Sequence, residues 1–345
     1  MVYMWEEICE QPSVIERCRK ENMKKVRELT DLLKTKKITS AYIAARGTSD
    51  HASTYGKYLF GLTLGLPVSL ATPSVFTIYG KDIKFENCLV MAVSQSGKAA
   101  DALEVIRSAN RQGAITVSIT NDEESPLAKE AGYHLFCAAG KEISVAATKT
   151  FTSEMYLFAL LAAEWSGDKG FMKALEELPK GLSKTLELGD EIKSKAERYR
   201  FIEECFVLAR GVNYPIALEA TLKLQETNYV RAKGFAASDF LHGPFAMVER
   251  DTPVFVYAPD GPSRNDMDAM TDKLKNVGAE VIVISNVEEI LSKGETALRI
   301  PATDDDRISP FYNALVAQMF ACRLSLAKGL NPDQPRSLSK VTITR

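Results

Sequence analysis

The residues Ser94-Gln95-Ser96-Gly97 have the types and the order of an anion-binding turn. They follow an apolar run, Leu89–Val93, that is typical of a buried parallel strand, and a segment with helical periodicity comes after them. A strand that ends in small hydroxyl residues and a glycine before a helix presents free backbone N–H groups and the positive end of a helix dipole. The pattern therefore favours a phosphate-binding turn, although ordinary loop chemistry would produce the same residues.

A second group of residues, Glu219, Lys223 and Glu226, has helical spacing. Lys223 comes four residues after Glu219, and Glu226 comes three residues after Lys223, so all three share one face of a helix. Taken alone, this pattern favours an exposed ion-pair stripe, which stabilises a protein only weakly.

The chain has three histidines, His51, His134 and His242. A lone histidine is most often a structural hydrogen-bonding residue, but Gly243-Pro244 after His242 predicts a rigid turn that presents its ring. His51 is expected to shape the loop in which it lies, and His134 has no assignable role. Since the histidines and the six cysteines are dispersed, with no metal-ligand spacing, we expect neither a metal nor a cofactor.

An internal repeat indicates the elements that position these residues. Ala45-Arg46-Gly47 recurs as Ala209-Arg210-Gly211, 164 residues later, and each motif follows a strand-like run. The same offset, to within about one residue, relates Ser94 to the segment Tyr257–Gly261 and the run Ile115–Ile119 to the strand-like run Val281–Ile284. Landmarks that share one offset indicate two copies of one unit.

Each copy alternates short apolar runs with amphipathic segments, which predicts parallel strands covered by helices on both faces. The fold class is therefore α/β, with two tandem doubly wound, flavodoxin-like domains whose ligands bind at the carboxyl ends of the strands. We expect a helical segment at 1–35, a first domain at 36–165, a helical connection at 166–199, a second domain at 200–330 and a tail at 331–345. The buried face of the first helical segment is predicted to be Val14, Ile15, Cys18, Val26, Leu29 and Leu33.

Composition excludes several classes of protein. Apolar residues make up 46% of the chain, charged residues 26%, and the net charge is −2, so a globular protein is expected and a nucleic-acid partner is not. The N-terminus lacks the pattern of a signal peptide, and the apolar stretch Tyr156–Ala163 is too short to span a bilayer. With no CxxC pair among the cysteines, we expect reduced thiols and a cytoplasmic location.

Several motifs, in their order along the chain, resemble the paired sugar isomerase (SIS) domains of the isomerase half of glucosamine-6-phosphate synthase. The resemblance runs from about residue 40 to the end and rests on ARGTSDHA, SQSGKAAD, EISVAATKTFTSE, YPIALEATLKLQE, SDFLHGP and NPDQPRSLSKVT. Three segments, Arg46–His51, Phe240–Pro244 and Lys340–Arg345, are closer still to stand-alone glucosamine-6-phosphate deaminases of this architecture. The resemblance implies two SIS domains that bind a hexose 6-phosphate.

The resemblance also implies which residues bind the substrate. The sugar phosphate would be surrounded by two loops, and the residues concerned are Gly47, Thr48, Ser49, Ser94, Gln95 and Ser96. Where the family commonly has a further hydroxyl residue, this chain has Ala99, and the adjacent Lys98 is expected to replace part of the lost donor. The loop containing Glu142, Ser144 and Thr148 would line the pocket, with the backbone of Val145 and Ala146 against the sugar hydroxyls.

Four residues have catalytic counterparts in the family, and this changes the interpretation of the charged stripe. The resemblance implies that Glu226 moves a proton between C1 and C2 of the open-chain sugar, with Lys223 close by, and that Glu219 is among the residues that bind the substrate. His242 would open the sugar ring and reach the site from the neighbouring subunit of a homodimer. Lys340 matches a lysine that forms a Schiff base with a C2 ketone, and in a deaminase it would either do this or position the sugar.

Three functions compete. The first is an isomerising deaminase that converts glucosamine 6-phosphate and water into fructose 6-phosphate and ammonia. The second is the synthase isomerase half or a deglycase for another amino-sugar or Amadori-sugar 6-phosphate, and the third is a non-catalytic sugar-phosphate sensor. About 40 residues before the first repeat leave no room for a glutaminase or a helix-turn-helix domain, and so we expect the deaminase.

Overall fold

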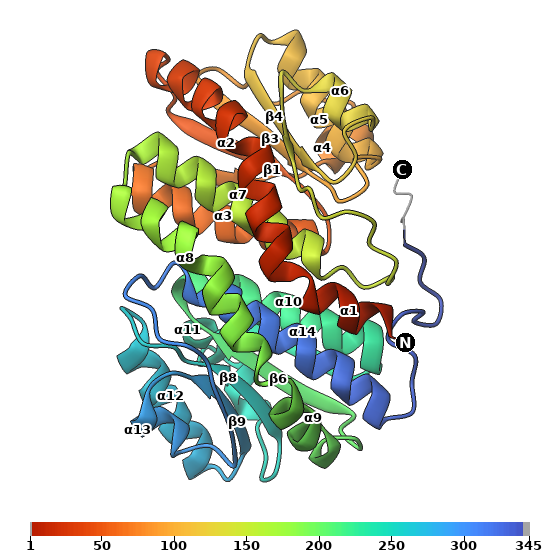
Figure 1. Ribbon diagram of the computed structural model, residues 1–345, viewed down its shortest axis with the longest axis vertical. Helices are drawn as coiled ribbons and strands as arrows, with labels where there is room; N and C mark the ends of the chain where they lie inside the picture. Colours follow the sequence, from red (N-terminus) through yellow and green to blue (C-terminus); the bar gives the residue numbers. More distant parts are fainter. Residues whose placement is uncertain (1, 341–345) are drawn as a thin grey trace. The chain divides into compact units, whose positions relative to one another are not determined.

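The computed structural model describes residues 2–340 and separates into two compact units, which we describe one at a time (Figure 1). The first unit consists of Glu10–Glu142, Lys149–Glu177 and the chain from Ser339. The second unit consists of the chain up to Cys9, Ile143–Thr148 and Leu178–Leu338. Short stretches of the chain therefore leave each unit and return to it. None of the helices described is long and apolar enough to cross a membrane.

The first unit is built on a five-stranded parallel sheet with the order β2-β1-β3-β4-β5. Its strands are β1 Ser40–Ala44, β2 Val68–Leu70, β3 Cys88–Val93, β4 Ile115–Thr120 and β5 Tyr133–Phe136. All six residues of β3 are buried, as expected of a central strand covered on both faces. The direction of strand order reverses between β1 and β3, which confirms the doubly wound fold.

The second unit repeats this plan with the order β10-β9-β8-β6-β7, again with parallel pairs throughout. Its strands are β6 Glu204–Ala209, β7 Arg231–Ala236, β8 Pro253–Tyr257, β9 Glu280–Ser285 and β10 Thr296–Arg299. Because β6 takes the place of β1 and β8 that of β3, the two sheets have the same connectivity. The duplication indicated by the sequence is therefore confirmed.

The helices of the first unit include the predicted N-terminal one. They are α2 Gln11–Thr35, α3 Thr48–Leu64, α4 Ser74–Thr77, α5 Ala100–Arg111, α6 Pro126–Glu130, α7 Lys149–Ser166 and part of α8 Lys169–Leu186. The six residues predicted to form the buried face of α2 are each at most 1% exposed, so this prediction is confirmed. The apolar stretch Tyr156–Ala163 forms the buried centre of α7, which packs against α2 and α3.

The helices of the second unit cover both faces of its sheet. They are the remainder of α8 with α1 Tyr3–Cys9, α9 Gly189–Arg198, α10 Tyr214–Asn228, α11 Ala237–Phe240, α12 Arg264–Asn276, α13 Glu288–Leu291 and α14 Ser309–Ala327. Short 3-10 turns at Gly211–Asn213 and Pro244–Met247 complete it. Figure 1 shows α9 and α12 on opposite sides of this sheet.

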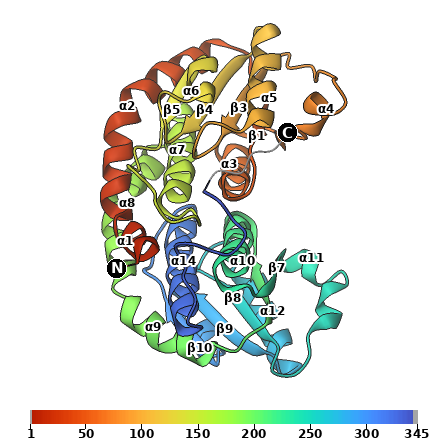
Figure 2. The ribbon, with the colours of Figure 1, turned by 90° about the vertical axis from the view of Figure 1, so that its right-hand side faces the viewer.

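Side-chain contacts assign α10, α11 and α14 of the second unit to faces of its sheet. On one face, Phe255 of β8 contacts Phe320 of α14 at 5.0 Å between ring centroids. Gly234 of β7 lies on the same face, where an added Cβ would come within 2.7 Å of Thr221 of α10. On the other face, Phe206 contacts Phe240 of α11 at 5.2 Å. Consequently α10 and α11 lie on opposite faces of one sheet (Figure 2).

Candidate functional site

The two predicted phosphate loops lie together in the first unit. β1 and β3 are adjacent and parallel, with Ala44 opposite Ala92, so the loops that follow them leave the sheet at the same carboxyl edge. Strand order reverses between these strands, which is where ligands bind in open α/β sheets. The loops carry Gly47, Thr48 and Ser49 after β1, and Ser94, Gln95, Ser96 and Lys98 after β3.

The Ser94–Gly97 turn is held by its own backbone. The Gly97 N–H donates to the Ser94 carbonyl at 3.1 Å, and Gly97 has a φ of +62°. Ser94 and Gln95 are half-buried, and their side chains make no hydrogen bond within residues 2–340, so both can donate to a ligand. The Ser96 hydroxyl accepts from the backbone N–H of the exposed Lys98 at 3.4 Å, which leaves its own proton available. Helix α5 begins at Ala100.

The loop after β1 forms the start of α3. Gly47 is its N-cap with a φ of +55°, and Thr48 is half-buried in the first turn. Ser49 is buried, and its hydroxyl donates to the Glu154 carboxylate at 2.9 Å. Because a serine hydroxyl has one proton, Ser49 would have to exchange this bond before it could donate to a phosphate.

Sequence reasoning missed an ion pair that ties the two loops together. Arg46 Nε lies 2.7 Å from Asp101 Oδ2, and Asp101, in the first turn of α5, is 2% exposed. The second unit repeats the pair, with Arg210 Nε 2.5 Å from Asp266 Oδ2 in the first turn of α12. The signal was present, since both arginines stand in the repeated Ala-Arg-Gly motif. The first pair fixes the loop after β1 to the start of α5, and the second fixes the loop after β6 to the start of α12.

Lys340 lies against a buried carboxylate of the first unit. Its ammonium donates to Glu142 Oε2 at 2.8 Å, and the Glu142 side chain is fully buried. Glu142 also accepts from the backbone N–H and the hydroxyl of Thr150, at 3.2 and 2.8 Å. A Schiff base requires a neutral amine, so Lys340 would have to lose a proton and this ion pair to act as a nucleophile.

The charged triad of α10 lies in the second unit. Lys223 Nζ is 3.2 Å from Glu219 and 2.6 Å from Glu226, and the side chains of Lys223 and Glu219 are fully buried. Burial opposes the charged form of Lys223, but the two carboxylates more than offset this and raise its pKa above the ordinary value. The exposed stripe that the pattern alone would favour is therefore not what the structure contains, because this face of α10 is largely buried.

Glu226 is the member of the triad that can reach a ligand. Its side chain is 21% exposed, whereas those of Glu219 and Lys223 are not exposed. Lys223 holds its Oε2 atom, and Oε1 makes no hydrogen bond among the described residues. A carboxylate with one oxygen anchored and the other accessible is suited to taking and returning a proton.

His242 is an exposed residue in the turn after α11. Gly243, with a φ of +136°, and Pro244 follow it, as the predicted turn requires. The residue borders a cavity of about 400 Å³ that Arg210 and Asp266 also line. Since α11 and α10 lie on opposite faces of the sheet, the structure does not bring His242 and Glu226 of one chain together.

The loop before α7 crosses into the second unit. The backbone N–H groups of Ile143 and Ser144 donate to Glu7, and that of Val145 donates to the Asp333 carbonyl at 3.1 Å. Ala146 is 1% exposed. The Val145 N–H is therefore already used, and a sugar hydroxyl could contact Val145 only through its carbonyl oxygen in this arrangement.

The remaining histidines and the cysteines have structural surroundings. His51 lies in the first turn of α3, where its N–H donates to the Gly47 carbonyl at 3.2 Å. His134 in β5 hydrogen-bonds Ser118 at 3.0 Å. All six cysteines are free thiols, and Cys9 alone is exposed. Within the described part of the chain, no group of three or more His, Cys, Asp or Glu residues could hold a metal.

Comparison with known sequences gives one family. The SIS domain matches residues 33–164 and 202–328. Glutamine–fructose-6-phosphate aminotransferases [isomerizing] of Methanothermobacter thermautotrophicus and Aquifex aeolicus are 33% and 35% identical over 98% and 99% of this chain. The chain spans 57% of the length of each of these relatives.

Solved structures share the whole architecture. A candidate phosphosugar isomerase from Silicibacter pomeroyi superimposes with a TM-score of 0.87 at 30% identity, over 96% of this chain and 100% of the other. The C-terminal domain of a glucosamine-fructose-6-phosphate aminotransferase from Francisella tularensis gives 0.87 at 25% identity, over 97% and 98% of the chains. A glucosamine-6-phosphate deaminase from Thermotoga maritima gives 0.82 at 20% identity, over 99% and 100%, and so shares the fold.

Proposed function

Because this chain belongs to the SIS domain family and carries two SIS domains, we propose that it acts on a hexose 6-phosphate by moving a proton between C1 and C2. We propose specifically that it converts glucosamine 6-phosphate and water into fructose 6-phosphate and ammonia. The observation that carries this proposal is the triad of α10, in which a buried lysine anchors one oxygen of the partly exposed Glu226.

The proposed proton transfer uses one carboxylate twice. In the open-chain aldehyde, Glu226 takes the proton from C2, and the electrons form a planar amino-enol across C1 and C2 as a proton passes from the substrate's own ammonium group to O1. Glu226 then returns its proton to C1, which leaves an iminium at C2. Water adds to the iminium carbon, ammonia leaves with the remaining proton as ammonium, and the C2 ketone of fructose 6-phosphate remains. Lys223 keeps the carboxylate oriented throughout because both its carboxylate partners hold it in place.

The phosphate is proposed to bind at the carboxyl edge of β1 and β3. Ser94, Gln95 and Ser96 can each supply a donor, and Lys98 adds a positive charge at the end of the turn. Neutral donors suit a doubly charged phosphate because they hold it without the cost of a buried cation. The Arg46–Asp101 ion pair supports the proposal, since it fixes the two loops relative to each other.

His242 is proposed to open the sugar ring in a site of the neighbouring subunit, in a homodimer. Two observations support this assignment: its side chain is exposed, and its turn lies on the sheet face opposite α10. Within one chain the sheet therefore stands between His242 and Glu226, whereas a partner subunit can present the histidine from outside.

The test measures ammonia and fructose 6-phosphate together, with glucosamine 6-phosphate as the substrate. Comparison substrates are epimeric 2-amino-2-deoxy-hexose 6-phosphates, their N-acetylated forms and 6-phosphorylated Amadori compounds. We expect equimolar products from glucosamine 6-phosphate, and a loss of about 10²–10⁴-fold in kcat for Glu226→Gln. Binding of fructose 6-phosphate should stay largely intact in this variant, because the phosphate contacts lie elsewhere.

Glu204→Gln is the matched control, since Glu204 is an exposed glutamate at the start of β6. It should retain full activity. Unchanged ammonia release by Glu226→Gln would overturn the assignment of the carboxylate. If fructose 6-phosphate were released only from an Amadori compound, the protein would be a deglycase. If the chain bound these sugar phosphates but turned over none of them, it would be a sensor.

A second candidate function is supported by the activity of the relatives. The curated sequences that match 98–99% of this chain are glutamine–fructose-6-phosphate aminotransferases. An isomerase half of that kind would run the same C1–C2 transfer towards glucosamine 6-phosphate. The test compares two rates at physiological concentrations: formation of glucosamine 6-phosphate from fructose 6-phosphate and ammonia, and breakdown of glucosamine 6-phosphate. Faster formation would favour this candidate.

A further inference from the structure

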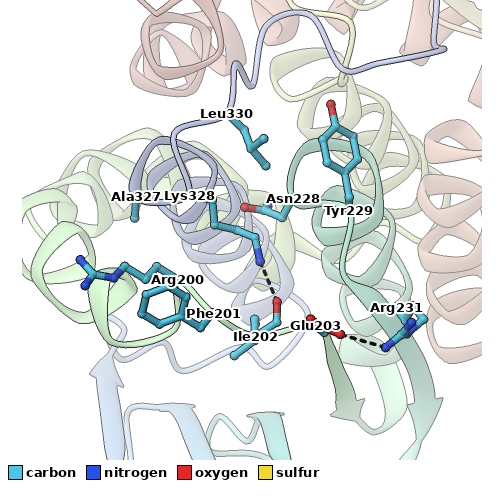
Figure 3. Close-up of a pocket in the computed structure, with 10 residues that line it drawn as sticks. All are labelled: Arg200, Phe201, Ile202, Glu203, Asn228, Tyr229, Arg231, Ala327, Lys328 and Leu330. Carbon is cyan, nitrogen blue, oxygen red and sulfur yellow. Dashed lines mark hydrogen bonds and ion pairs between the residues drawn. The ribbon is translucent and has the colours of Figure 1, made fainter.

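A cavity of about 640 Å³ opens in the second unit at the amino-terminal edge of the β6–β10 sheet. It lies between the end of α9, the end of α10 and the end of α14 (Figure 3). Its lining residues are Arg200, Phe201, Ile202, Glu203, Asn228, Tyr229, Arg231, Ala327, Lys328 and Leu330. None of these residues belongs to the predicted phosphate loops or to the α10 triad, and the volume is that of an ordinary small-molecule site.

The lining is rich in positive charge. Three cations, Arg200, Arg231 and Lys328, line the cavity together with one carboxylate, Glu203, which pairs with Arg231 at 3.3 Å. Arg200 lies over the exposed Phe201 ring, 4.8 Å from its centroid, and its other charged contact is a solvent-exposed one to Glu197. Exposed ion pairs are weak and exchange readily, so these guanidinium groups can turn to a ligand. The excess charge favours an anion, and the forked guanidinium groups suit a phosphate.

Lys328 brings a partly buried ammonium to the same cavity. It donates to the Ile202 carbonyl at 2.6 Å, and two of its three protons remain for other acceptors. Burial lowers the pKa of Lys328, and Glu203 and Cys205 partly oppose this effect. An anion in the cavity would stabilise the charged ammonium, and the ammonium would in turn attract the anion.

Asn228 supplies an unsatisfied acceptor in the wall. Its Nδ2 group donates to Thr227 Oγ1 at 2.8 Å and to the Ala321 carbonyl at 3.1 Å. The amide cannot be turned over, because the Thr227 hydroxyl already donates to the Lys223 carbonyl and can only accept from Asn228. The Oδ1 atom is therefore the one left without a partner, in a residue that is 1% exposed. A buried acceptor without a donor destabilises the protein, and a ligand hydroxyl that donates to it would remove this cost.

The geometry of Asn228 is consistent with this use. Figure 3 shows the oxygen end of its side chain turned towards Lys328, inside the ring of lining residues. A ligand held by the cations would thus have its hydroxyl groups near a free acceptor. The cavity combines what a phosphorylated sugar needs, namely positive charge for the phosphate and an acceptor for a hydroxyl.

The cavity also borders the C-terminal tail. Tyr229, the αL cap of α10 with a φ of +57°, lines it. The Tyr229 hydroxyl accepts from the Arg336 N–H at 2.9 Å, and the Arg336 guanidinium lies 4.0 Å above the same ring. A ligand against Tyr229 would therefore restrain the segment around Arg336.

We propose that this cavity is a second binding site, separate from catalysis, for a phosphorylated ligand that carries hydroxyl groups. Arg200, Arg231 and Lys328 hold the phosphate, and Asn228 Oδ1 accepts from a hydroxyl. Occupancy restrains the tail through Tyr229.

Calorimetric titration of the full chain with fructose 6-phosphate tests the site. We expect two molecules bound per chain. Arg200→Gln/Arg231→Gln should weaken one of them by at least about ten-fold, and Ser94→Ala/Ser96→Ala should weaken the other. Arg198→Gln/Lys233→Gln is the matched control, because both residues are exposed cations that lie on α9 and β7 outside the cavity. This control should retain both binding events.

Two further measurements use the wild-type chain alone. At the second site fructose 6-phosphate should bind at least about ten-fold more tightly than inorganic phosphate, because of the hydroxyl contact, and unphosphorylated fructose should not bind. Hydrogen exchange of the backbone around Arg336 should slow on binding. One binding event per chain that Ser94→Ala/Ser96→Ala abolishes would overturn the proposal, as would equal affinity for inorganic phosphate. The affinity and hydrogen-exchange measurements test the second site even if the protein does not turn over glucosamine 6-phosphate.

Discussion

The ion pair between Lys340 and Glu142 separates two roles for this lysine. An arginine at position 340 can keep the charge and the contact to Glu142, but it cannot form a Schiff base. Deamination through Glu226 needs no lysine adduct, since water completes the step at C2. We therefore expect Lys340→Arg to keep kcat within about ten-fold of the wild type, and Lys340→Met to lose considerably more, because it removes the cation that lies against the buried Glu142 carboxylate. Steady-state kinetics with glucosamine 6-phosphate measure both.

Borohydride provides an independent readout of the same question. Reduction during turnover traps a lysine–sugar adduct as a stable mass increase, which peptide mass spectrometry locates. We expect no adduct on Lys340. An adduct there, together with an inactive Lys340→Arg variant, would assign Lys340 as a nucleophile instead.

His134 predicts how stability depends on pH. Burial, and then repulsion from Lys25, lower its pKa to about 4 from the ordinary 6.5, although Asp122 opposes the shift. The unfolded chain therefore takes up this proton first as the pH falls. Stability should be constant with respect to this group above pH 6.5 and should decrease from there towards pH 4. Urea unfolding across this range should show a smaller decrease for His134→Gln, and identical profiles would contradict the assignment.

The charged triad illustrates what the sequence cannot predict at the scale of residues. The spacing of Glu219, Lys223 and Glu226 correctly places them on one helix face. It contains no information on whether that face meets solvent. The answer depends on contacts with α14, which lies far along the chain and packs against α10. The resemblance to a family, rather than the pattern, was the basis for proposing a catalytic role for these residues.

At the scale of elements, Gly97 is the residue on which the turn after β3 depends. Its φ of +62° is strained for any residue with a Cβ, and an added Cβ would lie 2.1 Å from Ser125 Oγ. Gly113 is a matched control, because its φ is +72° and no atom lies within 4 Å of an added Cβ. We expect Gly113→Ala to cost about 1–2 kcal/mol of unfolding free energy and Gly97→Ala to cost more, since it adds a clash to the same strain.

The functional consequence of Gly97→Ala is equally specific. A displaced Ser94–Gly97 turn should raise KM for the sugar phosphate, whereas Gly113→Ala should leave KM unchanged. Denaturant unfolding and steady-state kinetics on the two variants provide the comparison. Equal effects of both substitutions on KM would show that this turn does not contact the phosphate.

The central strands were predictable from the sequence and the edge strands were not. β3, β6, β8 and β9 are mainly apolar runs, because both faces of each are covered, whereas β4 alternates apolar residues with Thr and Ser. The edge strand β7 alternates exposed Arg231 and Lys233 with small residues, and β2 is three residues long. Such segments have no hydrophobic periodicity, and their place in the sheet follows from pairing with β6 and β1.

At the scale of the whole molecule, the duplication was predictable, whereas the exchange of chain segments between units was not. One offset was enough to predict two sheets of equal connectivity. Ile143–Thr148 nevertheless belongs to the second unit, where Glu7, Asp333 and Gln318 bind its backbone. These partners are distant in sequence, so no local pattern specifies them.

Because α10 and α11 lie on opposite faces of one sheet, we can test whether each active site is shared between two subunits. If His242 acts in the site of a partner subunit, a dimer of Glu226→Gln and His242→Gln chains contains one site with both wild-type residues. Random assembly makes about half of the dimers mixed, and each mixed dimer has one working site of two, so activity should recover to about a quarter of the wild type.

Co-expression with two different affinity tags, followed by tandem purification, isolates the mixed dimers. In this fraction activity should reach about half of the wild type, while each parent variant alone stays inactive. Purified mixed dimers without activity would mean that His242 does not serve a partner's site, and the exposed turn after α11 would then need another role.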